Sequence, residues 1–414
     1  MTATHRKSGS VSPVTPDRPP RAKAWHTHLL CALAAAAAAS LVWYWTSSGA
    51  TDVLLWGCFL YGLYRLPRTW AFWCTQGWPF LIVIVFALAM LPFSMAPYES
   101  SRDAVKVGKA VAAASALPLI FHSRARVRSA LFWSALVLTC ILTADLVRLV
   151  SLFGSEIIAK GRFHEPHVLN HPNVASMMSA LCFWVWLAFA WRSRGSGMKP
   201  LLGICAAVVN LLYLVSLASR GPQIAFAGSA VISPFLLPGK KAKLAALAVC
   251  VLLGAVVALN LQRINERFFE ETSMRSFSSR DIVWRHTAAL AARHPWLGHG
   301  YGKKLFRHTY ETSNPPPSPF EYPHAHQYWL KLFFEYGIVG LLLFAFAWAW
   351  LAVRLLLHVF RQPDMDRRLL PALCAVLLAC LHIYGLGDFP DGIVEYAMIG
   401  LVPLSLVVIR QPAA

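Results

Sequence analysis

The stretch His324–Gly340 reads HAHQYWLKLFFEYGIVG and leads from a polar loop into a long apolar run. The ionisable side chain of His326 therefore lies where the chain enters an apolar helix. Gly337 and Gly340, further along, predict a thin face on which that helix packs closely. Polar groups at such a boundary are costly unless they serve a site. The stretch predicts a membrane helix with a candidate functional histidine at its head.

The composition around this stretch is that of a membrane protein. Of 414 residues, 57% are hydrophobic and only 14% are charged, and the mean hydropathy is +0.51. Soluble globular proteins carry about 25% charged residues. The net charge of +19 does not indicate nucleic-acid binding, because it is spread over short loops between apolar runs. We therefore expect an all-α, polytopic integral membrane protein.

The apolar runs predict the domain organisation. A spanning helix needs about 20 apolar residues, and by that rule the chain has about twelve candidates. They are 28–46, 51–66, 71–95, 103–121, 129–153, 173–191, 199–217, 222–237, 243–262, 324–357, 369–386 and 391–409. The expected division is a disordered basic tail (1–27), nine spans (28–262), a large loop with short helices (263–323) and three final spans (324–414).

The loops alternate in charge and so predict the topology. One set is basic, as in Arg124/Arg126/Arg128 and Lys240/Lys241/Lys243, and the N-terminal tail and Arg410 belong with it. The positive-inside rule places this set and both termini in the cytoplasm. The large loop then lies on the other side. Within it, Arg280 to Ala292 has helical spacing, with Ser278 or Ser279 as the expected N-cap.

Several arginines are candidate anion ligands on the non-cytoplasmic side. Arg220, in LASRGPQ, follows an apolar run on an expected tight re-entry turn, and Arg280 and Arg285 lie in the large loop. The guanidinium fork suits phosphate or carboxylate. The alternatives are a snorkelling arginine for Arg220 and a solvated helix face for Arg285, which has Asp281 four residues earlier. For Arg148 we expect a structural intramembrane pair with Asp145.

His326 is a candidate general base, because a neutral imidazole accepts a hydroxyl proton near neutral pH. The alternative is an interfacial histidine bonded to a backbone carbonyl. His324 lies two residues away and is expected to point elsewhere on the helix. A zinc site at HAH or at His164/His167/His171 is a rival, but no HExxH pattern occurs and the nearby carboxylates adjoin proline. We therefore expect no metal.

Four motifs together resemble the O-antigen ligase family, which lies in a larger group with O-antigen polymerases and protein O-oligosaccharyltransferases. GRFHEPHVLNHPN, which ends at Asn173, resembles the family's Asn-containing helix start, and SRG at Ser219–Gly221 resembles its outer-boundary arginine. SSRDIVWRHTAALAARHPWLGHGYG, from Ser278, resembles its loop signature. HQ-x9-GIVG, from His326, resembles its ligase motif. Their order along the chain and their common side make the combination fairly specific.

The resemblance implies a metal-independent, inverting glycosyltransferase of the bacterial inner membrane that needs no cofactor. It implies transfer of a glycan from undecaprenyl diphosphate to a sugar hydroxyl of lipid A–core on the periplasmic face. His326 would activate the acceptor hydroxyl, and Arg220 and Arg280 would neutralise the diphosphate. The expected substrate-binding residues are Arg285, His324, Gln327, Arg148 and Asn173.

Three other functions stay open. A polymerase or a protein-glycosylating enzyme would use the same donor with a different acceptor. A transporter or flippase of lipid-linked glycans would need a polar path through the bilayer, and the apolar runs hold few charges besides Asp145 and Arg148. A non-catalytic scaffold would not need the basic, histidine-rich outer face.

Overall fold

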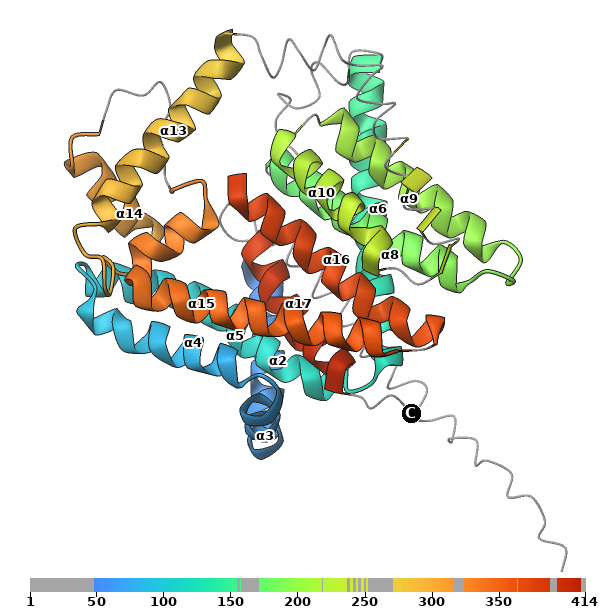
Figure 1. Ribbon diagram of the computed structural model, residues 1–414, viewed down its shortest axis with the longest axis horizontal. Coiled ribbons are helices and arrows are strands. Elements are labelled where there is room, and N and C mark those ends of the chain that lie inside the picture. The colour runs from blue at the N-terminus through green and yellow to red at the C-terminus, as the bar shows by residue number, and fades with distance from the viewer. Residues whose placement is uncertain are drawn as a thin grey trace, which may run out of the picture.

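The protein is built from helices, as the computed structural model in Figure 1 shows. The structure describes residues 48–154, 157, 171–217, 219–236, 271–315, 324–362, 364–387 and 393–410, and a few positions between 239 and 251. The helices are α2 (Ser48–Tyr64), α3 (Leu66–Gln76), α4 (Trp78–Met90), η1 (Leu91–Phe93), α5 (Pro97–Ile120), α6 (Arg124–Phe153), α8 (Pro172–Arg192), α9 (Lys199–Ser216), α10 (Arg220–Leu236), α13 (Glu271–Ala291), α14 (Lys303–Thr312), α15 (Tyr328–Arg361), α16 (Met365–Gly387) and α17 (Ile393–Arg410). The all-α prediction is confirmed for the described residues.

Five described helices are long and apolar enough to cross a membrane, and they make the chain a multi-pass membrane protein. They are α6, α8, α9, α15 and α16, and α3 with α4 gives a sixth if that bent pair is one span. The expected twelve spans are therefore not confirmed. The expected span 28–46 and most of 243–262 lie outside the described residues. Helices α2 and α10 have only 17 residues each, and α5 opens with charged side chains.

The expected single helix over 71–95 is wrong, because the chain bends by 106° between α3 and α4. Gly77 lies at the bend, and a Cβ there would be 2.3 Å from the Trp73 ring. Pro79 follows in the first turn of α4, where its missing N–H costs no helical hydrogen bond. A glycine that admits the ring and a proline that starts a new helix together explain the break.

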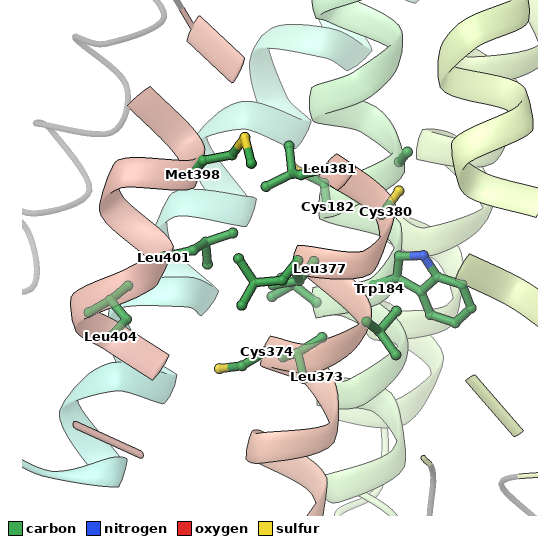
Figure 2. Close-up of a cluster of buried hydrophobic side chains, with 14 of the residues drawn as sticks. Cys182, Trp184, Leu373, Cys374, Leu377, Cys380, Leu381, Met398, Leu401 and Leu404 are labelled. Carbon is green, nitrogen blue, oxygen red and sulfur yellow. The ribbon is translucent and has the colours of Figure 1, made fainter. Parts of the chain in front are cut away.

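The core of the bundle lies around α8, which buries most of its length against α6, α9, α10, α16 and α17. Figure 2 shows leucines of α16 between Met398 and Leu401 of α17 and Trp184 of α8. Buried hydrogen bonds join the helices. The Trp184 Nε1 donates to Ser229 Oγ at 3.0 Å. Such bonds and close packing hold spanning helices together where lipid gives little hydrophobic driving force.

Residues 271–315, with α13 and α14, form a small unit at one side of the bundle, which we call the outer unit (Figure 1). It has its own apolar core of Val283, Leu290, Phe306 and Tyr310. This core also contains Ala325, which precedes α15, and Phe334 of α15. Helix α13 ends at Ala291, before Pro295. The expected start at Arg280 is wrong, because α13 begins at Glu271, so Ser278 and Ser279 lie inside the helix and cannot cap it.

The outer unit attaches to α15 where that helix is broken at Gly337, which has φ 63° and ψ −165°. The break releases backbone groups of α15, and the segment 295–302 binds them. The N–H of His299 donates to Phe334 O at 2.9 Å, and the N–H of Gly300 to Glu335 O at 3.1 Å. In return, the N–H of Ile338 donates to Pro295 O at 2.7 Å. We call this backbone pairing the glycine joint.

Glycines allow the two backbones of the glycine joint to approach. A Cβ on Gly298 would lie 2.5 Å from the Glu335 carbonyl carbon, and one on Gly337 would lie 2.3 Å from that of Trp296. The expected thin face of Gly337 and Gly340 is confirmed, although Gly337 also breaks the helix, which the spacing did not predict.

The side chain of His299 closes the glycine joint. Its ring stacks on Phe334 with centroids 4.4 Å apart. Burial, and secondly the neighbouring His294, lower the pKa of the His299 imidazole to about 4, so this ring is neutral at neutral pH. The ring that packs at the glycine joint therefore carries no charge.

We predict that Gly337→Ala destabilises the protein by about 1–3 kcal/mol, because the backbone of an alanine is strained at this φ and ψ. The Cβ of the alanine would also meet the Trp296 backbone. Gly108→Ala is the control, since a Cβ there meets nothing within 4 Å. Thermal unfolding in detergent measures both. Equal melting temperatures for Gly337→Ala and the wild type would contradict the role given to the glycine joint.

Candidate active site

His326 lies directly before α15, and the fold constrains it on both sides. The preceding Ala325 is fully buried in the apolar core of the outer unit. The following Gln327 caps α15, because its side-chain oxygen accepts the Leu330 N–H. His326 itself has φ 49°, which is uncommon for a residue other than glycine. Strained backbone of this kind is retained mostly at functional positions.

His324 lies beside His326, with ring centroids 4.0 Å apart. The expectation that it points elsewhere is wrong, because it assumed a helix through both residues. The helix begins at Tyr328, and the buried Ala325 lets the flanking histidines turn toward each other. The structure therefore brings two imidazoles together at the head of α15.

Arg280 reaches from the outer unit to the bundle. Its Nη1 donates to the Gly387 carbonyl at 2.9 Å, at the last residue of α16. A cation at a helix C-terminus is favourable. Arg280 lies within α13, so its side chain projects from the middle of that helix rather than from its N-terminus.

Arg285, one turn further along α13, points to solvent. Its side chain is 80% exposed and pairs with Asp281, as the spacing predicted. The Asp281 partner raises the pKa of the Arg285 guanidinium, so it stays charged. Its expected role in substrate binding remains a prediction.

Arg220 is the first residue of α10, and only the short link after Ser216 separates it from α9. The expected tight re-entry turn is confirmed. Arg220 is half-buried, with Gly221 and Pro222 behind it in the first turn. The N–H groups and the dipole of a helix N-terminus attract anions, as the guanidinium does.

Arg148 makes the structural pair that was expected. Its Nη2 donates to Asp145 Oδ1 at 2.7 Å, and Tyr213 Oη donates to Asp145 Oδ2 at 2.6 Å. The Asp145 side chain is fully buried, whereas that of Arg148 is 36% exposed. The carboxylate is thereby satisfied inside the bundle. Arg148 keeps an exposed portion, so its expected role as a ligand stays a prediction.

Asn173 is buried in the first turn of α8, and its N–H donates to His171 Nδ1 at 3.2 Å. The expected helix start with Asn173 is confirmed, whereas its role is not tested. His164 and His167 lie outside the described residues. Within the described residues, no group of three or more His, Cys, Asp or Glu side chains could hold a metal.

These residues lie at one end of the bundle, which we call the site end. Gly228 of α10 meets Ile383 of α16, while Ser229 meets Cys380, so the two helices run antiparallel. Arg220 and Gly387 are therefore at the same end. The Trp329 ring stacks on His382 with centroids 6.1 Å apart, which places the head of α15 there too.

His382 was missed by the sequence analysis. It lies in α16 among the rings of Tyr328, Trp329 and Trp348, and packs against the first turn of α15 behind His326. The available signal was an ionisable residue inside an apolar run, which indicates a role by default. Its packing supports the turn that carries His326.

The chain is similar in sequence to known proteins. Residues 205–345 match the sequence model of a family described as O-antigen ligase. An O-antigen ligase of Pseudomonas aeruginosa is 28% identical over 172 residues, which are 40% of this chain and 39% of that protein. The chain thus aligns with about two fifths of its relative. The resemblance that the motifs indicate is confirmed, and residues 205–345 contain Arg220, Arg280 and His326.

We predict that His326→Asn keeps or raises the melting temperature, because Asn tolerates positive φ. His326→Val should lower the stability by about 1–3 kcal/mol, because a β-branched residue is strained there. Thermal unfolding of the two purified variants measures the difference. If Val is as stable as Asn, the backbone at this position is not strained.

Proposed function

We propose that this relative of the O-antigen ligases is a glycosyltransferase that moves O-antigen polysaccharide from undecaprenyl diphosphate to a sugar hydroxyl of lipid A–core. The observation that carries the proposal is His326. It is held at a positive φ at the site end, inside the region that matches the family, and the outer unit brings Arg280 to the same end. An imidazole base and several guanidinium groups are what this transfer needs.

The reaction is a single displacement at the anomeric carbon of the donor. His326 accepts the proton of the acceptor hydroxyl, whose oxygen forms the new glycosidic bond. The bond from the anomeric carbon to the diphosphate oxygen breaks with its electron pair, so the configuration inverts. The diphosphate leaves as an anion, which Arg220 and Arg280 stabilise.

Guanidinium groups supply the charge that a divalent cation supplies in other glycosyltransferases, so the proposed mechanism is independent of metal. At Arg220, the N-terminus of α10 attracts an anion in addition to the charge of the guanidinium. Gln327, His324, Asn173, Arg148 and Arg285 are proposed to bind the glycan or diphosphate. No cofactor takes part in this displacement.

The proposed location is the bacterial inner membrane, with the site end toward the periplasm and both termini in the cytoplasm. Basic residues at the opposite end support this orientation, including Arg124 at the start of α6 and Arg410 at the end of α17. Lys and Arg are retained on the cytoplasmic side of membrane proteins. In this orientation, the lipid-linked donor and the lipid acceptor both reach the site end from the periplasmic leaflet.

An O-antigen polymerase or a protein O-oligosaccharyltransferase is the second candidate, because it would use the same donor at the same residues. A transporter or flippase of lipid-linked glycans is less well supported. The buried charge of Asp145 is paired with Arg148 and Tyr213, as expected for a structural element rather than a polar path.

We predict that His326→Asn lowers product formation by about 10²–10⁴-fold, the usual contribution of a general base. Asn is chosen because it tolerates the backbone at this position. The assay supplies purified protein with lipid-linked glycan and lipid A–core, with a chelator present throughout. His308→Asn, an exposed position on α14, is the control and should keep full activity.

Undiminished activity of His326→Asn would remove His326 as the base. Loss of wild-type activity in the chelator would instead favour a metal. Product from lipid-linked glycan alone would favour the polymerase.

We predict that Arg220→Ala weakens donor use more than Arg220→Lys, because Lys keeps the charge and loses only the fork. The expected loss for Ala is about tenfold or more, since a charge-assisted bond contributes roughly 1.5–3 kcal/mol. The Michaelis constant and turnover for the lipid-linked donor measure it, with exposed Arg293→Ala as the control. Equal kinetics for Arg220→Ala, Arg220→Lys and wild type would contradict the diphosphate role.

A further inference from the structure

The end of the bundle opposite to the site end gathers arginines from three helices. Arg124 and Arg128 lie at the start of α6, Arg192 at the end of α8, and Arg367 and Arg368 at the start of α16. We call these five residues the basic cluster. The proposed reaction uses none of them.

The structure holds part of the basic cluster in place with neutral groups. Arg124 Nε donates to the Val408 carbonyl at 3.2 Å, and its Nη2 bonds to His358 Nε2. Gln362 Nε2 also donates to His358 Nε2, at 3.2 Å. Since arginine and amide nitrogens only donate, His358 Nε2 must be an acceptor and the ring is neutral. These bonds fix the guanidinium of Arg124 but bring it no negative charge.

Four of the five guanidinium groups lie close enough for neighbours among them to repel one another. Arg128 is within electrostatic range of Arg192 and Arg124, and Arg124 of Arg367. Within the part of the chain that the structure describes, two carboxylates oppose them. Asp366 lies near Arg128, and Asp364 Oδ2 is 3.6 Å from Arg367 Nε. Among these described residues, five arginines face two aspartates, which leaves positive charge in excess. Arg124 and Arg128 are half-buried. Gathering like charges around partly desolvated groups is costly unless an anion joins them.

A second observation comes from Arg368. Its guanidinium lies over the Phe360 ring, 5.3 Å from the centroid, and its Nε is buried. Among the described residues, this Nε has no hydrogen-bond acceptor. A buried donor left without an acceptor costs free energy, and the cost is larger for a charged group. The side chain is therefore arranged for an acceptor that the described part of the chain does not supply.

We infer that the basic cluster binds the phosphate of an anionic phospholipid in the leaflet opposite to the site end. The arginines lie at the ends of helices that span the membrane, which is the depth of the headgroups. The guanidinium fork fits phosphate oxygens. Helices α6 and α16 both begin here, so their N-termini add to the attraction for an anion. A free phosphate has the same chemistry, but only a lipid is held at this depth by its acyl chains.

The test adds lipid to the full-length protein in detergent and follows thermal unfolding and bound lipid by native mass spectrometry. The probes are phosphatidylglycerol, phosphatidylcholine and inorganic phosphate at equal concentrations. We expect phosphatidylglycerol alone to raise the melting temperature and to remain bound. In Arg128→Gln/Arg192→Gln, its apparent affinity should fall by about 30-fold, because each arginine near an anionic surface contributes about fivefold.

The matched control is Arg194→Gln/Arg361→Gln, which removes the same charge from exposed positions at the same end. It should keep the affinity of the wild type. An equal loss in both double variants would mean general charge attraction and would overturn the proposed site. Equal stabilisation by phosphatidylcholine would overturn it too, and equal stabilisation by phosphate would show an adventitious ion only. If Arg128→Gln/Arg192→Gln does not fold, the exposed Arg192→Gln alone takes its place, with Arg194→Gln as its control, and the same outcomes apply.

Discussion

The glycine joint is the constraint on which the rest of the structure depends. Gly337 breaks α15, so that Phe334, Glu335 and Ile338 offer backbone groups which a continuous helix would use internally. The segment from Pro295 to Gly300 pairs with them. This pairing holds the outer unit against the bundle, and the core of the outer unit buries Ala325 between the two histidines. The position of His326 thus follows from a backbone break 11 residues later in the chain.

Hydrogen bonds fix two arginines at the site end. Arg280 bonds to the end of α16, and Asp145 is paired with Arg148 and Tyr213 inside the bundle. These contacts hold the guanidinium groups of Arg280 and Arg148 at defined positions of the site end. Preorganised charge of this kind is commonly the largest contribution to catalysis when negative charge develops on a leaving group. The opposite end carries the basic cluster, for which we propose a different ligand.

Sequence patterns predicted the parts of this structure that depend on composition and local spacing. The apolar helices, the Asp145–Arg148 and Asp281–Arg285 pairs and the turn before Arg220 follow from neighbouring residues. Patterns could not predict that the loop signature and the ligase motif bind each other, because Gly337 and the backbone of Trp296 meet only through the tertiary fold. The bend at Gly77 was missed for a similar reason, since an apolar run alone does not show that the Trp73 ring fills the turn. The contact of His324 with His326 required knowing where α15 begins.

The central claim is that one diphosphate contacts arginines of both the bundle and the outer unit, beside His326. A structure of the protein with bound undecaprenyl diphosphate tests this most directly. We expect phosphate oxygens within about 3 Å of the guanidinium groups of Arg220 and Arg280, a charge-assisted hydrogen-bond distance. His326 should then face the acceptor side of the linked sugar. A diphosphate bound away from both arginines would contradict the account.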